Sequence, residues 1–551
     1  MTDESNSPSS SLGSITASFI ILIVLPLLAH FRYSWMGFNP TDDGFILAYS
    51  RRIIEGQIPH LDFISIRPVG SPLLHIPFVL FGGGYTFWIS RLFVWFEFAA
   101  IAAIWTSLLA AFRGKSFDFI ERVSFALIIF GISVADFPIM AWHTIDGLLF
   151  SSLGIYLTLK QERWRKLIGY SLIGIACLCK QNFVVVGIAT LILFEDWRSW
   201  KSWIAFVLPA AAYFGILALY SALPDALTQL TSQADLLSVG ILSYFSKYGF
   251  IPGIVYGYVA FRLIDKKNIT VKFPVKYASL IGSVAIFIIP LAINLAACLG
   301  KSKEQSSFAL FGMALGTTIY LISQKLKTGA SLSRIPLTII ILAWSVSLSV
   351  GYNSPALACG ILMALILCLF QNFTRSEIGQ KIIYWLIPLL AILTIVCFDY
   401  VRHENVYRDR PAAELTMALD GTLPGGNKIK TNPRTHEFLT DLKRAIDQTN
   451  GVRYAIIPDC AGYWVKSTQS NPLPIDWAQG TELNSPALLE RVHDAIENNR
   501  DSIFILAQKV MASRLNEEFI PQLENKYYSV VKYIHSHLNK VGETELFEIY
   551  R

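Results

Sequence analysis

The chain has 551 residues, of which 53% are hydrophobic and only 16% are charged. Soluble domains carry about 25% charged residues. The low figure here comes from repeated apolar runs, each long enough to approach the roughly 20 residues with which a helix crosses a bilayer core. We therefore expect a polytopic membrane protein. The net charge of +6 lies on loop lysines and arginines, without a basic stripe interleaved with aromatic residues, which argues against nucleic acid as a partner.

Cysteine usage and the N-terminus add two expectations. All cysteines except Cys460 fall in or beside apolar runs, where they behave as small hydrophobes. We therefore expect no disulfide and no cysteine-based metal site. Residues 1–14 are rich in serine and lack the basic start of a signal peptide, so a short tail should precede an uncleaved first helix.

The apolar runs predict about thirteen membrane spans. They cover residues 15–33, 85–112, 123–140, 146–159, 167–179, 183–194, 203–220, 248–264, 277–299, 308–322, 335–350, 355–370 and 382–398. The fifth and sixth are too short to cross unless they tilt or break around Lys180, which is tolerated where helices line a cavity. The expected fold is a polytopic α-helical membrane domain over residues 15–398, followed by a C-terminal domain.

Loop charges predict an orientation. Lysine and arginine gather in every second loop, whereas the alternate loops at 138–145 and 351–354 carry almost none. By the positive-inside rule the N-terminus is then cytoplasmic, and an odd number of spans puts the C-terminus outside. We expect an integral protein of a bacterial-type cell membrane, with the first loop, 37–84, and the C-terminal part on its external face.

The first external loop contains two segments too short to cross. Residues 45–54 have the pattern of an amphipathic helix lying at the membrane interface among lipid headgroups, and Gly56 is placed to end it. Residues 73–81 form a second short apolar segment that ends at three glycines. We interpret these glycines as a turn rather than a phosphate-binding loop.

Residues 399–551 predict a small external α/β domain, because about 150 residues suffice for one. The pattern predicts helices at 435–448 and 487–497, and strands at 452–458, 502–507, 527–535 and 544–550. Trp464, Trp477 and Tyr463 can stack on sugars or pack a core, and core packing is the commoner role.

Asp42 and Asp43 directly follow the first span and are the strongest candidates for chemistry. Adjacent carboxylates raise each other's pKa, so holding two of them together has a cost. One can take the proton from an attacking hydroxyl, with the second, or a bound cation, tuning it. The alternative is that one of them only caps the next helix.

The segment around this pair resembles the membrane-embedded GT-C glycosyltransferases. The resemblance rests on the acidic pair after the first span, a helix ended by glycine in 55–63 (EGQIPHLDF), and 67–72 (RPVGSP) ahead of Phe81-Gly82. More narrowly, it is similar to bacterial members of the protein-mannosyltransferase and aminoarabinose-transferase type. The similarity is clear over residues 15–110.

The resemblance implies a reaction. In that family the acidic residue opening the first external loop is the general base, or helps to hold the acceptor, and Asp42 occupies this position. Asp43 stands where many members carry glutamate. The donors are sugars linked through phosphate to a polyprenyl carrier, and the acceptor is a lipid, a glycan or a protein.

Such a donor needs positive charge at its phosphate, which arginine or lysine can supply. The candidates for substrate binding are Arg51, Arg52, Arg67, and Lys180 with its neighbour Gln181. An ionisable residue within an apolar stretch suggests a functional site, although a lysine can also snorkel at a loop. Arg51 and Arg52 fit equally well on a helix face held by lipid phosphates.

The second external loop contains His143 and Asp146. Several members of the family carry an acidic residue there, so Asp146 is a candidate to bind a divalent cation with Asp42 or Asp43, or to orient the acceptor. The alternative roles are a helix cap for Asp146 and an interfacial polar residue for His143. Glu97, inside a span, is better suited to interhelical hydrogen bonding.

These observations predict a membrane-bound hexosyl- or pentosyltransferase that acts at the external face. The rival interpretation is a secondary transporter or lipid flippase, which typically shows paired halves with discontinuous helices near the midplane. A second rival is a non-catalytic membrane protein whose C-terminal domain recognises a partner. No paired halves are visible, the carboxylates lie at the interface, and a sizeable domain follows the last span.

Overall fold

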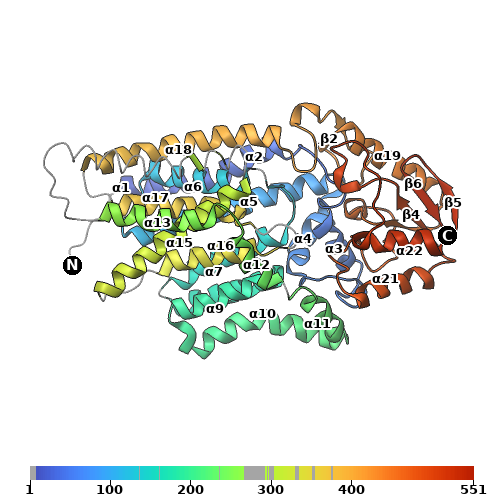
Figure 1. The fold of residues 1–551 in the computed structure, drawn as a ribbon, viewed down its shortest axis with the longest axis horizontal. Coiled ribbons are helices and arrows are strands. Elements are labelled where there is room, and N and C mark those ends of the chain that lie inside the picture. Colours follow the sequence, from blue (N-terminus) through green and yellow to red (C-terminus); the bar gives the residue numbers. More distant parts are fainter. Residues whose placement is uncertain are drawn as a thin grey trace.

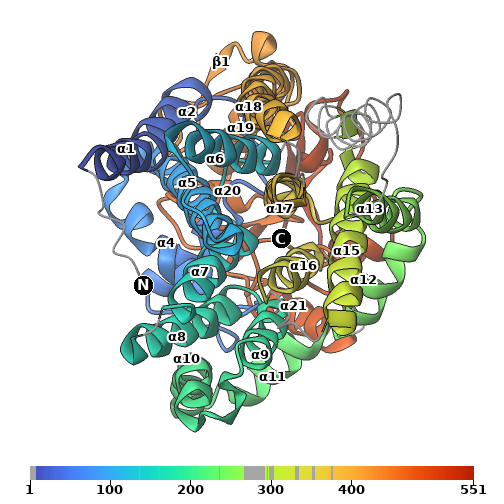
Figure 2. The ribbon, with the colours of Figure 1, turned by 90° about the vertical axis from the view of Figure 1, so that its left-hand side faces the viewer.

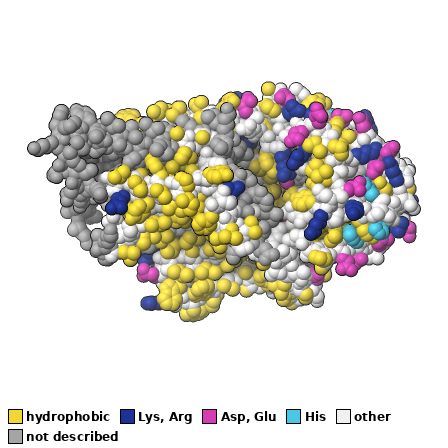
Figure 3. All heavy atoms as spheres, in the orientation of Figure 1, with side chains coloured by type: hydrophobic (Ala, Val, Ile, Leu, Met, Phe, Trp, Pro, Cys, Tyr) yellow, Lys and Arg dark blue, Asp and Glu magenta, His cyan; other side chains and the backbone are white. Residues whose placement is uncertain are grey.

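The computed structural model describes residues 8–135, 137–160, 162–234, 236–265, 292–293, 296, 303–328, 334–349, 354–373 and 377–551. The molecule is elongated, with a bundle of helices at one end and a domain containing a small sheet at the other (Figure 1). Side chains on the face of the bundle in Figure 3 are mostly hydrophobic, whereas acidic and basic side chains gather on the second domain.

The bundle begins with α1 and ends with α18. Its helices are α1 (Pro8–Phe19), α2 (Leu25–Tyr33), α5 (Thr86–Arg113), α6 (Phe119–Val134), α7 (His143–Thr158), α8 (Arg163–Cys179), α9 (Val184–Leu193), α10 (Trp200–Leu219), α11 (Leu223–Thr231), α12 (Leu236–Phe245), α13 (Phe250–Asp265), α15 (Lys303–Thr328), α16 (Arg334–Ser347), α17 (Cys359–Phe373) and α18 (Glu377–Glu404). Viewed along the bundle in Figure 2, α17 lies inside, and 89% of its apolar window is buried. Only 28% of the apolar window of α10 and 33% of that of α18 are buried. These two helices therefore present apolar side chains to the outside of the bundle, where lipid would surround them.

The expected number of thirteen spans is not confirmed. Within the described residues, six helices are long and apolar enough to cross a membrane: Gly13–Tyr33, Gly83–Arg113, Trp200–Leu219, Gln305–Leu326, Ala356–Phe373 and Gly379–Glu404. Four further apolar helices are shorter: Gly70–Phe81, Gln181–Leu193, Phe250–Leu263 and Arg334–Ser347. The expected break at Lys180 is present, because its extended backbone separates α8 from α9. The span expected at 277–299 lies mostly outside the described residues.

Glycines let neighbouring helices approach closely. A Cβ added to Gly154 on α7 would lie 2.6 Å from the carbonyl oxygen of Gly169 on α8. One added to Gly257 on α13 would lie 2.2 Å from the carbonyl oxygen of Met313 on α15. Backbone contacts of this kind are typical of helix packing in membranes, where dispersion rather than hydrophobic burial drives association.

The first loop lies between the bundle and the second domain (Figure 1). It carries the two expected short helices, α3 (Phe45–Ile54) and α4 (Gly70–Phe81). However, α3 does not keep one face free for lipid headgroups: residues 45–50 and Arg52 are all buried. At its start, a Cβ on Gly44 would lie 2.2 Å from the Cα of Gly462, so the second domain rests directly on this helix.

The C-terminal domain is a four-stranded sheet in the order β3-β4-β6-β5, covered by helices. Its elements are β1 (Met417–Ala418), β2 (Lys430–Thr431), α19 (Pro433–Asp447), β3 (Arg453–Ile457), α20 (Ala461–Trp464), α21 (Pro486–Asn498), β4 (Ile503–Gln508), α22 (Ser529–His537), β5 (Lys540–Glu543) and β6 (Phe547–Tyr550). Strands β3 and β4 are parallel, and the other pairs of this sheet are antiparallel. Along β3, Tyr454 and Ile456 pack with α19, whereas Ala455 and Ile457 pack with α21 and α22, as the alternation of a strand requires.

The strand expected at 527–535 is wrong, because that segment forms α22. Its buried residues Val530, Val531 and Ile534 have the spacing of one helix face. Because β-branched residues favour strands, a short run that contains them also fits a strand pattern. The strand β5 lies in the stretch that follows α22 and pairs with β6. The other predicted strands, at 452–458, 502–507 and 544–550, are confirmed as β3, β4 and β6.

We predict that Arg52 is needed to hold the C-terminal domain on α3. Its guanidinium donates to both carboxylate oxygens of Asp476 at 2.7 Å, and the two side chains are only 5% and 3% exposed. Arg52→Ala leaves Asp476 buried without its cation and should destabilise the protein by about 3–5 kcal/mol. Thermal unfolding in detergent measures the loss.

The neighbouring arginine is the matched control. Arg51 pairs with Glu55 one turn along the helix, with side chains 26% and 21% exposed. Arg51→Ala should therefore cost about 1 kcal/mol or less. Equal melting temperatures for the two variants would contradict the docking role of Arg52.

Candidate active site

A cavity of about 740 Å³ lies where the helical bundle meets the C-terminal domain. The first loop contributes Asp42 and Arg67 to its wall, and the second loop contributes Trp142 and Thr144. Further lining residues come from the second loop, from the end of α16 and the segment between α16 and α17, from the segment after α18, and from the C-terminal domain: Phe137, Pro138, Met140, Val346, Ser349, Ser354, Ala356, Leu357, Tyr407, Arg408, Trp477, Gln479, Thr481, Met511, Ser513, Arg514, Tyr527 and Tyr528. The cavity thus has an apolar helical side and a polar side.

Asp42 is held at this cavity by two residues that follow the last helix of the bundle. The hydroxyl of Tyr407 donates to Asp42 Oδ2 at 2.7 Å, and Arg408 Nη1 lies 2.8 Å from the same oxygen. The turn before α3 fixes the backbone, since the Asn39 side chain accepts a hydrogen bond from the Asp42 amide. Burial raises the pKa of Asp42, and Arg408 and Tyr407 oppose this rise.

The backbone of Arg408 is in the left-handed region, with φ of 48°. This conformation is unfavourable for a residue with a side chain, and such residues concentrate at functional sites. The sequence does not predict a role for Arg408 or Tyr407, because residues 402–430 are polar and rich in proline and glycine, as in a linker or an ordered loop. The dense run of charged residues just after the last span is the signal that marks this segment.

Asp43 points away from the cavity and has different partners. Its carboxylate pairs with Arg91 Nη2 at 2.7 Å and accepts the backbone amide of Asn39 at 2.8 Å. Arg91 also donates to the carbonyl oxygens of Ser34 and Gly37, so this pair locks the end of the first span. Neither carboxylate caps α3, whose N-cap is Gly44 without a side-chain hydrogen bond.

Asp459 is a second buried carboxylate near Asp42, and the sequence did not mark it. It follows β3 in the C-terminal domain and is 2% exposed. Burial, and next the charge of Asp42, raise the pKa of Asp459 to about 8. Its Oδ1 atom has no hydrogen-bond partner. The raised pKa favours the neutral form of Asp459, which reduces its repulsion of Asp42.

Lys180 is buried behind the cavity wall. It is 5% exposed, and its Nζ donates to the hydroxyl of Thr144, a lining residue, at 3.2 Å. Within the described residues, no carboxylate pairs with this ammonium. Gln181 donates to the carbonyl oxygens of Ile66 and Leu230 and so holds neighbouring backbone segments.

The three arginines expected near the donor have separate positions. Arg51 and Arg52 pair with Glu55 and Asp476, and neither lines the cavity. Arg67 does line it, while its Nη1 pairs with Glu482 Oε1 at 2.7 Å. Of the three, only Arg67 is placed to meet a ligand.

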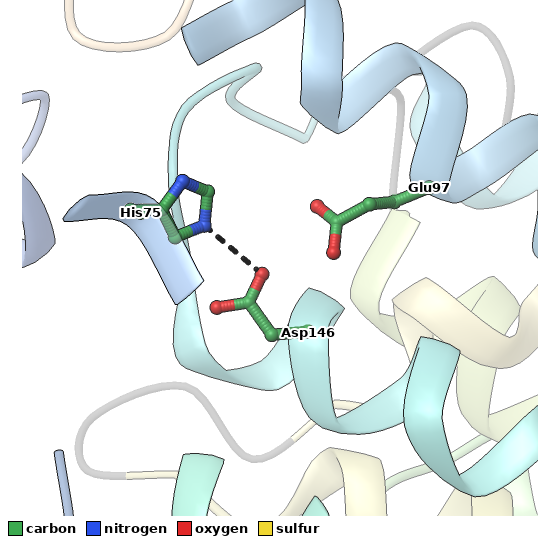
Figure 4. Close-up of side chains that lie close together, drawn as sticks. All are labelled: His75, Glu97 and Asp146. Atoms are coloured by element: carbon green, nitrogen blue, oxygen red, sulfur yellow. Dashed lines mark hydrogen bonds and ion pairs between the residues drawn. The ribbon is translucent and has the colours of Figure 1, made fainter. Parts of the chain in front are cut away.

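The second-loop residues lie deeper than expected. His143 is 2% exposed, and neither of its ring nitrogens has a hydrogen-bond partner. Asp146 Oδ1 lies 3.2 Å from His75 Nε2, with Glu97 beside them (Figure 4). Within the described residues, Asp42 and Asp43 do not join Asp146 in a group of metal-ligand atoms. Asp146 is not the cap of α7 either, because Trp142 holds that position.

Comparisons with known proteins cover both the sequence and the structure of the chain. No protein-family model and no curated protein matches it. Its structure is similar to the crystal structure of ArnT, an aminoarabinose transferase, from Cupriavidus metallidurans in the apo state, with 10% identity, 98% of each chain covered and a TM-score of 0.43. For the same protein bound to undecaprenyl phosphate the values are 11% identity, 99% of this chain, 98% of that chain and a TM-score of 0.40.

We predict that Asp42 and Asp43 contribute differently to stability. Asp43→Asn removes the charge that compensates Arg91 and should lower the free energy of unfolding by about 3–5 kcal/mol. Asp42→Asn should change it far less, because burial already disfavours the charged form of Asp42. Thermal unfolding of the two single variants tests this, and a lower melting temperature for Asp42→Asn than for Asp43→Asn would contradict it.

Proposed function

We propose that the chain is a membrane glycosyltransferase that moves a sugar from a polyprenyl-phosphate donor to an acceptor hydroxyl on the external face of a bacterial-type cell membrane. The observation that carries this proposal is the buried carboxylate of Asp42 on a cavity shared by an apolar bundle and a polar domain. A lipid-linked sugar needs both surroundings. Its polyprenyl tail belongs among apolar helices, while the sugar and the acceptor need polar side chains.

Asp42 is suited to act as the general base. Its carboxylate takes the proton of the acceptor hydroxyl while the hydroxyl oxygen attacks the anomeric carbon. The bond from that carbon to the phosphate oxygen breaks, and the lipid phosphate leaves with the bonding electrons. A single displacement of this kind inverts the configuration at the anomeric carbon. Tyr407 and Arg408 orient the carboxylate through their contacts with Oδ2.

The leaving phosphate needs positive charge more than it needs a proton. Arg67 and Arg514 line the cavity, and Lys180 lies directly behind Thr144. We propose that these three residues stabilise the phosphate, since Arg51 and Arg52 are already engaged outside the cavity. A cation shared by Asp42, Asp43 and Asp146 is not part of the proposal, because the three carboxylates have separate partners.

We predict that Asp42→Asn abolishes transfer. Loss of a general base costs a factor of about 100 to 10,000 in rate. The assay uses protein in proteoliposomes, a labelled polyprenyl-phosphate sugar and an extract of envelope lipids, glycans and proteins as acceptors. The control is Asp420→Asn, the same change in an exposed turn of the C-terminal domain.

Full activity of Asp42→Asn would remove the assignment of the base. Movement of the labelled lipid between leaflets without sugar transfer, in the wild type, would instead support the rival interpretation of a flippase. Binding of the labelled lipid without turnover would point to a non-catalytic protein.

We predict that the rate of transfer depends on pH and that Arg408 determines the midpoint of this dependence. Protonated Asp42 cannot accept a proton, so the rate should rise with pH as Asp42 ionises, with a midpoint above the ordinary aspartate pKa of about 3.9. Arg408 lowers the pKa of Asp42, so Arg408→Gln should move the midpoint to higher pH. The matched control is Arg410→Gln, since Arg410 pairs with Glu414. Identical profiles for wild type and Arg408→Gln would show that another group limits the rate at low pH.

A further inference from the structure

Three ionisable side chains meet where α4 of the first loop packs against the bundle, outside the proposed catalytic machinery. His75 comes from α4, Glu97 from the middle of α5 and Asp146 from the first turn of α7 (Figure 4). His75 and Asp146 are 0% exposed, and Glu97 is 1% exposed. One ligand atom from each lies within 4.8 Å of the others.

Most of the polar atoms in this cluster have no partner. The single hydrogen bond joins His75 Nε2 to Asp146 Oδ1 at 3.2 Å. Both carboxylate oxygens of Glu97, Asp146 Oδ2 and His75 Nδ1 are buried without a hydrogen bond. Within the described residues, no lysine or arginine forms an ion pair with either carboxylate. Two buried carboxylates at this distance are very costly unless one of them takes up a proton or a positive charge lies between them.

We propose that His75, Glu97 and Asp146 bind one divalent transition-metal ion of the Zn²⁺ or Mn²⁺ type. A doubly charged ion balances both carboxylates and supplies the missing partner of the unpaired oxygens. The imidazole nitrogen selects this class, because Mg²⁺ and Ca²⁺ prefer oxygen ligands alone. Three protein ligands leave room for water in the remaining positions.

The bound ion has a structural consequence for the cavity. It joins α4 and α5, which follow one another in the chain, to α7. Asp146 lies two residues after Thr144, which lines the cavity and accepts the hydrogen bond of Lys180. The ion therefore fixes the start of α7 and, through it, the wall of the cavity. This inference does not depend on the proposed transfer reaction.

Elemental analysis of the purified protein tests the proposal. The wild type, purified in detergent without chelators, should contain about one equivalent of zinc or manganese per chain. Glu97→Gln keeps the shape of the side chain but removes its charge, and it should lower the metal content at least tenfold. Asp42→Asn is the matched control, because this buried carboxylate lies outside the cluster, and it should retain the metal.

A second measurement distinguishes loss of the metal site in Glu97→Gln from misfolding of this variant. Wild-type protein stripped with a chelator should melt at a lower temperature and recover when Zn²⁺ or Mn²⁺ is added, whereas Glu97→Gln should show no response to either ion. Metal-free wild type that also ignores added Zn²⁺ and Mn²⁺ would overturn the proposal and leave a proton shared by Glu97 and Asp146. Full metal content in Glu97→Gln would overturn it as well.

Discussion

Burial of charged side chains at the junction between the bundle and the C-terminal domain is the constraint on which the rest of the structure depends. A charge removed from water must be paired, and the partners here come from opposite sides of the junction. Arg52 on α3 pairs with Asp476, and Arg67 in the first loop pairs with Glu482. Separation of the two parts would expose both pairs, so the two parts can be expected to act as one unit.

The need to pair buried charges also gives the adjacent residues Asp42 and Asp43 different roles. Because successive side chains point in different directions, Asp43 reaches Arg91 inside the bundle while Asp42 reaches the cavity. The pair with Arg91 holds the end of the first span, and the backbone turn that it stabilises presents Asp42. In the sequence, the repulsion between the two adjacent carboxylates suggests a reaction centre. In the structure this repulsion is offset because Asp42 pairs with Arg408 and Asp43 pairs with Arg91.

The sequence predicts local features of this protein better than it predicts partners across the fold. The helix at 45–54, the break at Lys180 and three strands of the sheet follow from periodicity and composition, which report on immediate neighbours. Ser529–His537 forms a helix where the sequence predicts a strand, because a short run of β-branched residues fits both patterns. Tyr407, Arg408 and Asp459 lie far from Asp42 in the chain, and no local pattern shows that they meet it.

Carboxylates around the cavity determine how much positive charge each neighbouring cation can offer to a phosphate. Arg408 pairs with the carboxylate of Asp42, and Arg67 pairs with that of Glu482. The positive charge of each arginine is therefore partly neutralised within the protein. Within the described residues, Lys180 has only the hydroxyl of Thr144 as a side-chain partner. An ammonium held in a buried site without a carboxylate attracts an anion strongly, because water does not screen it. Among the buried cations at the cavity, protonated Lys180 is therefore the one whose field a lipid-linked phosphate would experience most, whereas Arg514 lines the same cavity from an exposed position.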